Sequence, residues 1–170
     1  MDYGVQKNLN VTSKTADERP IAVNAIIIRT NENGEKEFLF GMRAKHKSGG
    51  GQLGLIGGTQ AIGETMEQTL ARELYEEIGI TVNPSDLIWN NFFQCIAAPG
   101  VHFDHHGFVV TKFEGEPENK EPNKCDGLYW VKEQDLPQAL NNFFVSKGNL
   151  VNYLNGDKYN LATNFDYNKK

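Results

Sequence analysis

The pattern of hydrophobic and polar residues predicts a hairpin near the start of the chain. Ile21–Thr30 is rich in branched apolar residues and predicts a strand, and residues 31–36 carry a turn signal before a second strand at Glu37–Arg43. A third, short strand is expected near Leu53–Ile56. It lies within Ser48–Gly58, a glycine-rich loop whose backbone a ligand can approach closely.

A helix is predicted to follow this loop. Thr65 and Gln68 have the spacing of a capping box, and Gly79 has the place of a C-terminal cap. Four apolar residues recur at every fourth position and form the expected buried face: Met66, Leu70, Leu74 and Ile78. The glutamates of this segment lie off that face.

The second half of the chain predicts further strands and a short helix. These elements are expected in the following order: strands at Phe92–Ala98 and Val101–Phe113, an acidic loop at Glu114–Lys124, a strand at Leu128–Val131 and a helix at Glu133–Leu140. The first two strands form a second hairpin around Pro99 and Gly100. Beyond Phe144 the pattern allows either a closing helix or a closing strand.

Length and composition predict one globular domain. The chain has 170 residues, of which 39% are hydrophobic and 11% aromatic, and this is enough to bury a core without disulfides. Residues 1–19 are polar and are expected to form an N-terminal arm. Residues 20–145 form the predicted domain, and residues 146–170 a C-terminal segment that packs on the domain or frays.

Charge and cysteine content exclude several classes of protein. The net charge of −5 disfavours nucleic-acid binding, which depends on a basic surface. No apolar run approaches the about 20 residues of a membrane span, and no secretory signal is visible, so a cytoplasmic protein is expected. Cys95 and Cys125 match no metal-binding spacing and are interpreted as buried thiols.

A cluster of acidic residues on the predicted helix points to a metal ion. Glu73, Glu76 and Glu77 lie within one turn of each other, beside Arg72. Carboxylates this close raise each other's pKa, so a cation is expected among them. Hard oxygen donors without His or Cys suit Mg²⁺, and Mn²⁺ is the second choice. The alternative is a solvated charged face of the helix.

The segment around this cluster resembles the Nudix box, G-x5-E-x7-R-E-U-x-E-E-x-G-U, where U is aliphatic. Every specified position is filled: Gly58, Glu64, Arg72, Glu73, Leu74, Glu76, Glu77, Gly79 and Ile80. So many fixed positions at fixed spacing make the pattern highly specific. The resemblance extends to the flanking segments at residues 40–43 and 121–137 and identifies the chain as a suspected Nudix hydrolase of the MutT-like, nucleotide-cleaving type.

The resemblance implies an α/β fold, a Nudix-like α/β/α sandwich with a mixed sheet and a catalytic loop–helix–loop. It implies a Mg²⁺-dependent enzyme that cleaves a diphosphate bond in a small nucleotide, and a homodimer is common among similar proteins. The near-minimal size and the flanks favour cleavage of a nucleoside triphosphate to monophosphate and pyrophosphate. A nucleotide-sugar or ADP-ribose type pyrophosphatase stays open, as does a catalytically silent nucleotide-sensing domain.

The resemblance also assigns roles to individual residues. It implies that the three glutamates Glu73, Glu76 and Glu77 bind the metal, together with the backbone carbonyl of Gly57. Glu73 is expected to orient or deprotonate the attacking water, and Arg72 to be held by Glu64. Because family members differ in their general base, a downstream acid can serve instead, and three are candidates: Glu116, Glu118 and Glu121.

Substrate-binding residues are expected upstream of the box. Arg43 resembles a family position that contacts phosphate, and Lys45, His46 and Lys47 add positive charge beside it. The backbone of Gly57 and Gly58 is also expected to face substrate. The chain departs from many relatives at two positions, which carry Ile56 in place of proline and Ala61 in place of an acidic residue.

Two other groups of residues have alternative interpretations. The first group, which suits either a zinc site or hydrogen-bonded strand histidines and base contacts, is His102, Asp104, His105 and His106. Strand alternation places His105 on the face opposite the other three. The second group, which suits either base stacking or core packing, is Phe92, Phe93, Tyr129 and Trp130.

Overall fold

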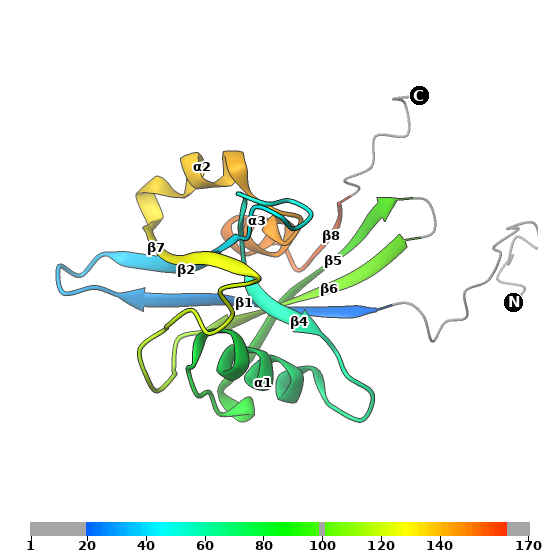
Figure 1. Cartoon of the computed structure of the whole chain (residues 1–170), viewed down its shortest axis with the longest axis horizontal. Coiled ribbons are helices and arrows are strands. Elements are labelled where there is room, and N and C mark those ends of the chain that lie inside the picture. Colours follow the sequence, from blue (N-terminus) through cyan, green and yellow to red (C-terminus); the bar gives the residue numbers. More distant parts are fainter. Residues whose placement is uncertain (1–19, 99–100, 163–170) are drawn as a thin grey trace, which may run out of the picture.

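The computed structural model of the chain describes residues 20–98 and 101–162, and it contains a mixed sheet with helices on both faces (Figure 1). Helix α1 (Met66–Ile78) covers one face of this sheet. Helices α2 (Leu136–Ala139) and α3 (Lys147–Asn155) lie on the other face. This arrangement is the α/β class with the mixed sheet that the resemblance to the Nudix box implies.

The strands form one eight-stranded sheet in which β3, β2, β1, β6, β5 and β8 are neighbours in this order, while β4 pairs with β1 and β7 with β2. Pairing is parallel between β1 and β6 and between β5 and β8, and antiparallel elsewhere. The bounds of the strands are β1 Ile21–Thr30, β2 Lys36–Arg43, β3 Leu53–Gly54, β4 Ile56–Thr59, β5 Ile88–Ala98, β6 Val101–Val110, β7 Cys125–Lys132 and β8 Tyr159–Ala162.

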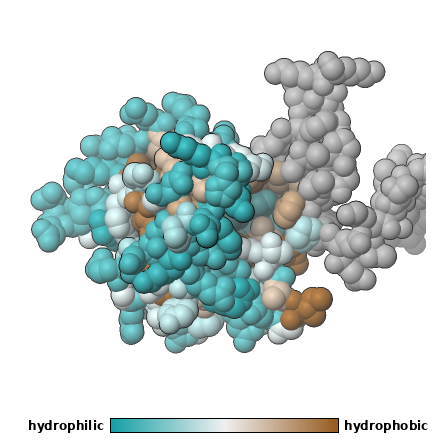
Figure 2. Space-filling view, in the orientation of Figure 1, coloured by the Kyte–Doolittle hydropathy of each residue, from teal (hydrophilic) through white to brown (hydrophobic). Residues whose placement is uncertain are grey.

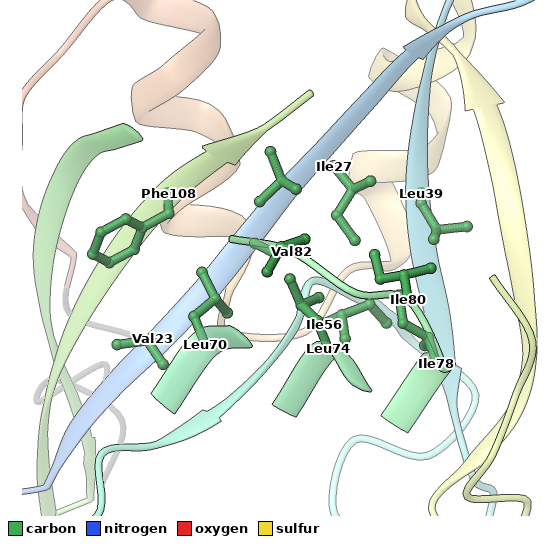
Figure 3. Close-up of a cluster of buried hydrophobic side chains, with 12 residues drawn as sticks. Val23, Ile27, Leu39, Ile56, Leu70, Leu74, Ile78, Ile80, Val82 and Phe108 are labelled. Carbon is green, nitrogen blue, oxygen red and sulfur yellow. The ribbon is translucent and has the colours of Figure 1, made fainter. Parts of the chain in front are cut away.

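Strand β1 lies at the centre of the sheet and is buried on both faces. Because successive side chains of a strand point to opposite sides, Val23 and Ile27 face α1, whereas Ile26 and Ile28 face α2 and α3. Figure 3 shows the cluster on the α1 side, where Leu70 and Leu74 meet β1 and β4. Side chains buried this completely contribute about 1.5–3 kcal/mol each to the stability of the fold.

A second hydrophobic cluster attaches α2 and α3 to the opposite face of the sheet. Leu136 of α2 and Leu150 of α3 are buried there against Phe38 and Phe40 of β2. The ring of Phe40 meets the ring of Phe143 edge to face, with centroids 4.9 Å apart. With apolar residues gathered in these two clusters, the face shown in Figure 2 is mostly hydrophilic.

A network of buried polar side chains also holds α3 on the sheet. The Asn24 amide of β1 donates to Asn149 Oδ1 of α3 at 2.8 Å and lies 3.0 Å from His105 Nδ1 of β6. The Asn149 amide in turn donates to Asn91 Oδ1 of β5 at 2.8 Å. Because Asn91 and Asn149 are fully buried, these partners replace the water that the amides lose on folding.

The structure corrects two of the expected elements. The single strand expected near Leu53–Ile56 is two strands, because β3 pairs with β2 whereas β4 pairs with β1. The helix expected at Glu133–Leu140 is α-helical only in α2, with 3-10 turns at Glu133–Asp135 and Leu140–Asn142. Pro137 lies in the first turn of α2, a position that proline tolerates because its missing N–H has no partner there.

Other boundaries shift by a few residues. The first hairpin and the loop at 114–124 are as predicted, while β5 begins earlier, β6 ends earlier and β7 is longer than expected. The closing segment contains both of the predicted alternatives, a helix and then a strand. The expected arm at residues 1–19 lies outside the described residues, and the proposed domain division stays a prediction. No helix among the described residues is long and apolar enough to cross a membrane.

Candidate active site

Helix α1 has the caps that the sequence predicts. Thr65 Oγ1 accepts a hydrogen bond from the Gln68 backbone at 3.1 Å, and Gln68 Oε1 accepts one from the Thr65 backbone at 2.9 Å. Gly79 ends the helix in the left-handed conformation, with φ of 73°. Three residues of the expected buried face, Leu70, Leu74 and Ile78, are buried, so the glutamates of the box lie on the other faces.

Arg72 joins the helix to the preceding loop. Its Nε donates to Glu64 Oε1 at 2.9 Å and its Nη2 to Glu64 Oε2 at 3.0 Å, which is the paired geometry that guanidinium and carboxylate favour. Thr69 Oγ1 donates to the same carboxylate at 2.8 Å. These hydrogen bonds, first that of Arg72, lower the pKa of Glu64. Arg72 is thus engaged by Glu64, as expected from the sequence.

The remaining amino group of Arg72 contacts two further glutamates. Nη1 lies 2.9 Å from Glu73 Oε1 and 3.3 Å from Glu76 Oε2. The Glu73 side chain is 16% exposed, whereas that of Glu76 is 54% exposed. Glu73 therefore lies against the protein, and Glu76 extends toward solvent along the same face of the helix.

A cavity of about 280 Å³ lies beside the end of α1. Acidic side chains line one part of it, Glu77 of α1 and Glu121 of the loop between β6 and β7. Three basic side chains also line it: Arg43, Lys47 and Lys124. A cavity that combines carboxylates with cations can hold a polyanion together with a divalent metal.

Glu77 is the most perturbed carboxyl group of this cavity. Its pKa is raised to about 7, first by burial and then by the negative charges of Glu73 and Glu121. Lys124 and a hydrogen bond from the Gly57 backbone oppose this shift in pKa only in part. Burial and the two neighbouring carboxylates therefore outweigh the positive charge near Glu77.

Glu121 is the one downstream acid among the three candidates that lines the cavity. Its Oε1 pairs with Lys124 at 2.8 Å, while its Oε2 is buried and has no hydrogen-bond partner among the described residues. Glu116 is exposed, and Glu118 pairs with Lys120 on the surface. The structure thus distinguishes Glu121 from the other two candidate bases. The sequence alone did not distinguish them.

At Gly57 and Gly58 other atoms lie so close to the backbone that a side chain would not fit. A methyl group on Gly57 would overlap the Val23 carbonyl of β1, and one on Gly58 would overlap the Glu73 carboxylate. These glycines therefore bring β4 against β1 and Glu73 against the backbone of β4. Gly57 lines the cavity beside Glu77, whereas Gly58 does not line it.

The oxygen donors fit a hard divalent cation. Among the described residues no three His, Cys, Asp or Glu side chains already converge as metal ligands, and Arg72 holds two of the expected ligands, Glu73 and Glu76. The mutual repulsion at Glu77 and the unpartnered Oε2 of Glu121 are nevertheless the two features that a cation would relieve. The donors are all oxygen atoms, which suits Mg²⁺.

The expected basic residues separate into two groups. Arg43 and Lys47 line the cavity, but Lys45 and His46 are exposed and do not. Lys45 borders a different surface hollow, beside Asp126. The grouping of Lys45 and His46 with Arg43 is therefore not reproduced, because the turn after β2 directs neighbouring residues to different sides.

The histidines of β6 have structural partners. His105 is buried and stacks on Phe93 with centroids 4.6 Å apart, and its pKa is lowered to about 4, first by burial. His106 Nδ1 accepts a hydrogen bond from Trp89 Nε1 at 3.1 Å. The His102 side chain lies outside the described residues. Within the described part of the chain these residues form no metal cluster, so the zinc interpretation is unsupported.

The four candidate stacking residues do not line the cavity. Phe93 is in the core, Phe92 stacks on Tyr159, and the Arg29 guanidinium covers Trp130 at 3.9 Å. Tyr129 is exposed and borders the hollow beside Lys45. These aromatic side chains therefore pack in the core or on the surface, and none of them is placed to stack on a base in the cavity.

Sequence reasoning missed several cavity residues, among them Lys124, Cys125 and Phe144. Cys125 is half-buried, and its Sγ donates to the Gly127 carbonyl at 3.1 Å, whereas Cys95 is buried as expected. Phe144 lies under the Arg43 guanidinium. No local signal could have found Phe144, because Phe143 and Phe144 are adjacent and the sequence does not indicate which of the two rings faces a cavity.

Comparison of the sequence with known proteins identifies relatives of this arrangement. The family model of the NUDIX domain matches residues 19–152. The 8-oxo-dGTP diphosphatase of Escherichia coli K12 is 33% identical over 117 residues, which are 68% of this chain and 87% of that protein. The oxidized purine nucleoside triphosphate hydrolase of Danio rerio is 40% identical over 79 residues, 46% of this chain and 49% of that protein.

Solved structures give the same result. A MutT structure described for Aliivibrio salmonicida and Vibrio cholerae is 31% identical, with a TM-score of 0.59 over 81% of this chain and 96% of that one. The MutT Nudix hydrolase of Burkholderia pseudomallei is 26% identical, with a TM-score of 0.62 over 75% of this chain and 99% of that one. Since the family model spans most of the chain and includes the whole acidic helix, this protein belongs to the Nudix family and is a Nudix hydrolase.

Proposed function

We propose that this Nudix hydrolase cleaves a nucleoside triphosphate to a nucleoside monophosphate and pyrophosphate in the presence of Mg²⁺. Two relatives support this proposal, since both carry names that describe hydrolysis of an oxidised purine nucleoside triphosphate. We therefore place oxidised purine triphosphates, with 8-oxo-dGTP first, at the head of the substrates to be tested.

The observation that carries the proposal is the distribution of charge in the cavity. Glu77 and Glu121 provide oxygen donors in one part, while Arg43, Lys47 and Lys124 provide cations. A triphosphate needs both, because its oxygens bind cations directly and also share a divalent metal with carboxylates.

The residues have distinct roles in this proposal. The carboxylates of Glu73, Glu76 and Glu77 and the backbone carbonyl of Gly57 would hold the metal, which supplies charge neutralisation and a lower pKa of the attacking water. Glu73 orients that water and accepts its proton. Arg72 and Glu64 fix α1 against its loop, and their contacts with each other support this role.

Glu121 is a second candidate for the base. It lines the cavity and has one buried carboxylate oxygen without a hydrogen-bond partner among the described residues, whereas Oε1 of Glu73 accepts a hydrogen bond from Arg72. A carboxylate with a free oxygen can accept a proton from water without first breaking an ion pair. Comparison of Glu73→Gln with Glu121→Gln separates the two assignments, since the variant that lacks the base loses turnover at saturating metal.

The test is incubation of the purified protein with a panel of nucleoside triphosphates, nucleotide sugars and ADP-ribose, with and without Mg²⁺. We expect a nucleoside monophosphate and pyrophosphate, identified by chromatography and phosphorus NMR. Glu77→Gln should lower kcat/KM by more than about 100-fold, because even the outer partners of metal ligands are worth about 10- to 100-fold.

The matched control is Glu32→Gln, an exposed glutamate in the turn between β1 and β2. It removes the same charge far from the cavity and should leave kcat/KM unchanged. Release of sugar phosphate from a nucleotide sugar, with no turnover of any triphosphate, would contradict the proposed reaction. Absence of hydrolysis across the whole panel would instead favour a binding domain.

A further inference from the structure

The Arg43 side chain is held on two sides by residues that the box does not contain. Its guanidinium carbon lies 3.8 Å from the centroid of the Phe144 ring, and its Nε donates to the Ser48 carbonyl at 2.9 Å. The ring covers one face of the guanidinium, and the carbonyl fixes its rotation about the side-chain axis. A stacked and hydrogen-bonded guanidinium of this kind has one defined orientation.

These contacts leave the two amino groups of Arg43 available. Among the described residues only its Nε is engaged in a hydrogen bond, that to Ser48. Arg43 lines the cavity that also contains Glu77, Lys47 and Lys124. The paired amino groups of a fixed guanidinium match two oxygens of one phosphate group, which a lysine ammonium cannot do.

The position of Phe144 is itself fixed by the loop after β2 and by β3. Its backbone N–H donates to the Leu53 carbonyl at 2.7 Å, and its carbonyl accepts from the Lys147 N–H at 2.9 Å. A methyl group on Gly49 would overlap the Phe144 ring, and Gly49 has a φ of +70°. Only glycine therefore lets the loop lie against this ring without strain.

We propose that Phe144 and the Ser48 carbonyl are positioning groups that hold Arg43 as a fixed two-pronged donor for a phosphate group in the cavity. This inference rests on the proposed function, because it assigns the Arg43 cavity to the phosphates of a nucleotide. Phe144 acts through Arg43 and contributes no group to the reaction. The segment between α2 and α3 therefore helps to determine how the substrate is held, although it lies outside the box.

The experiment is a binding measurement that does not depend on turnover. The dissociation constant of inorganic pyrophosphate, the product expected from the proposed reaction, is measured by titration calorimetry without divalent metal. The variants are Phe144→Leu, Phe144→Tyr, Arg43→Lys, Arg43→Ala and the double variant Phe144→Leu with Arg43→Ala. The KM and kcat of an accepted triphosphate are measured on the same proteins with Mg²⁺.

We expect Phe144→Leu to weaken pyrophosphate binding about fivefold, the factor that corresponds to about 1 kcal/mol for ordering an Arg43 side chain that the ring no longer holds. Phe144→Tyr keeps an aromatic ring and should restore binding. Arg43→Lys should weaken binding nearly as much as Arg43→Ala, because a lysine cannot form the paired contact. In the Arg43→Ala background, Phe144→Leu should have no further effect, since Phe144 acts only through Arg43. In steady-state kinetics, Phe144→Leu should raise KM more than it lowers kcat.

The matched control is Tyr153→Leu, which removes another aromatic ring from the C-terminal part of the fold. Tyr153 contacts Phe38 with ring centroids 6.1 Å apart and does not line the Arg43 cavity. Its replacement should lower stability without changing the pyrophosphate dissociation constant. This control distinguishes a loss of Arg43 positioning from a general loosening of α3. A further variant, Gly49→Ala, should weaken pyrophosphate binding as Phe144→Leu does, because its methyl group displaces the Phe144 ring.

Three results would overturn the inference: no pyrophosphate binding by the unmodified protein, an unchanged dissociation constant in Phe144→Leu, or an equal loss in the presence and absence of Arg43. Failure of the proposed function gives a different pattern. In that case pyrophosphate binds and depends on Phe144 through Arg43, but no nucleoside triphosphate is hydrolysed.

Discussion

The charged residues of α1 and of the loop before it differ in whether their charge has a partner. Arg72 contacts three carboxylates at once, those of Glu64, Glu73 and Glu76. Glu77 has no such ion pair among the described residues, and its pKa is raised by burial and by neighbouring negative charge. The same helix thus carries carboxylates that pair with an arginine and one that does not.

Glu121 provides a residue-scale test of the acidic part of the cavity. We expect Glu121→Gln to lower kcat/KM by at least about 10-fold, the lower end of the effect of losing a group that supports a metal site. The control is Glu118→Gln in the same loop, where the carboxylate pairs with Lys120 on the surface. Steady-state kinetics at several Mg²⁺ concentrations provide the measurement, and equal activity of both variants would refute the role of Glu121.

Glu64 provides a contrasting test, because its contacts fix the loop and do not reach the cavity. Glu64→Gln replaces an ionic contact with Arg72 by a neutral one. Both side chains are about one-third exposed, so the expected loss is about 1 kcal/mol of unfolding free energy, with a smaller fall in kcat/KM than in Glu77→Gln. Urea denaturation measures the loss, and Glu133→Gln, which alters an exposed pair with Lys36, is the control.

Among the helices and strands, those whose ends are marked by residues close in sequence were predicted. Those whose position depends on contacts with distant strands were not. The ends of α1 were predicted from Thr65, Gln68 and Gly79, since each cap is a contact between residues near in sequence. Helix α3 was left undecided because Gly148 and Asn149 are weak helix formers. Its position depends on the hydrogen bonds of Asn149 to distant strands, which a local pattern does not contain.

The attachment of α3 can be tested at Asn149. Asn149→Ala removes its side-chain hydrogen bonds, which leaves the Asn91 carbonyl oxygen without a partner among the described residues and the Asn24 amide with its contact to His105 Nδ1. We expect a loss of about 1–3 kcal/mol in unfolding free energy, the cost of one unsatisfied buried polar group. Chemical denaturation measures this loss. Asn155→Ala, at the exposed end of the same helix, should change stability little, and an equal effect of the two substitutions would argue against the network.

For the whole molecule, the sequence predicted the class of fold, the mixed sheet and the acidic helix, but it predicted the cavity only in part. Glu77, Gly57 and Arg43 were expected, and all three line it. Glu121 could not be distinguished from Glu116 or Glu118, because the course of a loop between strands is set by its contacts with other elements. Lys45 and His46 were grouped with Arg43 by their nearness in sequence, yet the turn after β2 separates them in space.

Protonation of His105 should lower the stability of the whole molecule in weak acid, whereas protonation of Glu77, whose pKa is raised to about 7, should raise it over much of the same range. Burial lowers its pKa to about 4 in the folded protein, compared with about 6.5 in the unfolded chain. At His105 the unfolded chain binds more protons between these values, so the contribution of His105 to stability is fully present above pH 6.5 and is lost as the pH falls toward 4. The difference corresponds to about 3 kcal/mol.

Urea denaturation at pH 7.5, 5.5 and 4.5 measures this contribution as the difference between the unmodified protein and His105→Gln, because Glu77 is present in both. The variant should gain stability relative to the unmodified protein as the pH falls. Glu37 and Glu64, whose pKa values are lowered by arginine partners, lose their contributions only below about pH 4.5, so they act in a different range. The control is His46→Gln, which removes an exposed histidine. An unchanged pH dependence in His105→Gln would show that another group is responsible.

The loop that carries Glu121 is tied to the end of α1 by its backbone. The N–H groups of Glu118 and Lys120 donate to the Ile78 and Glu77 carbonyls, both at 2.9 Å. Surface loops usually accept changes in length, but this one has its register locked to the last turn of a helix. Inserting a single residue between Glu118 and Glu121 would therefore shift one wall of the cavity against the other, so the length of this connection is as constrained as the spacing within the box.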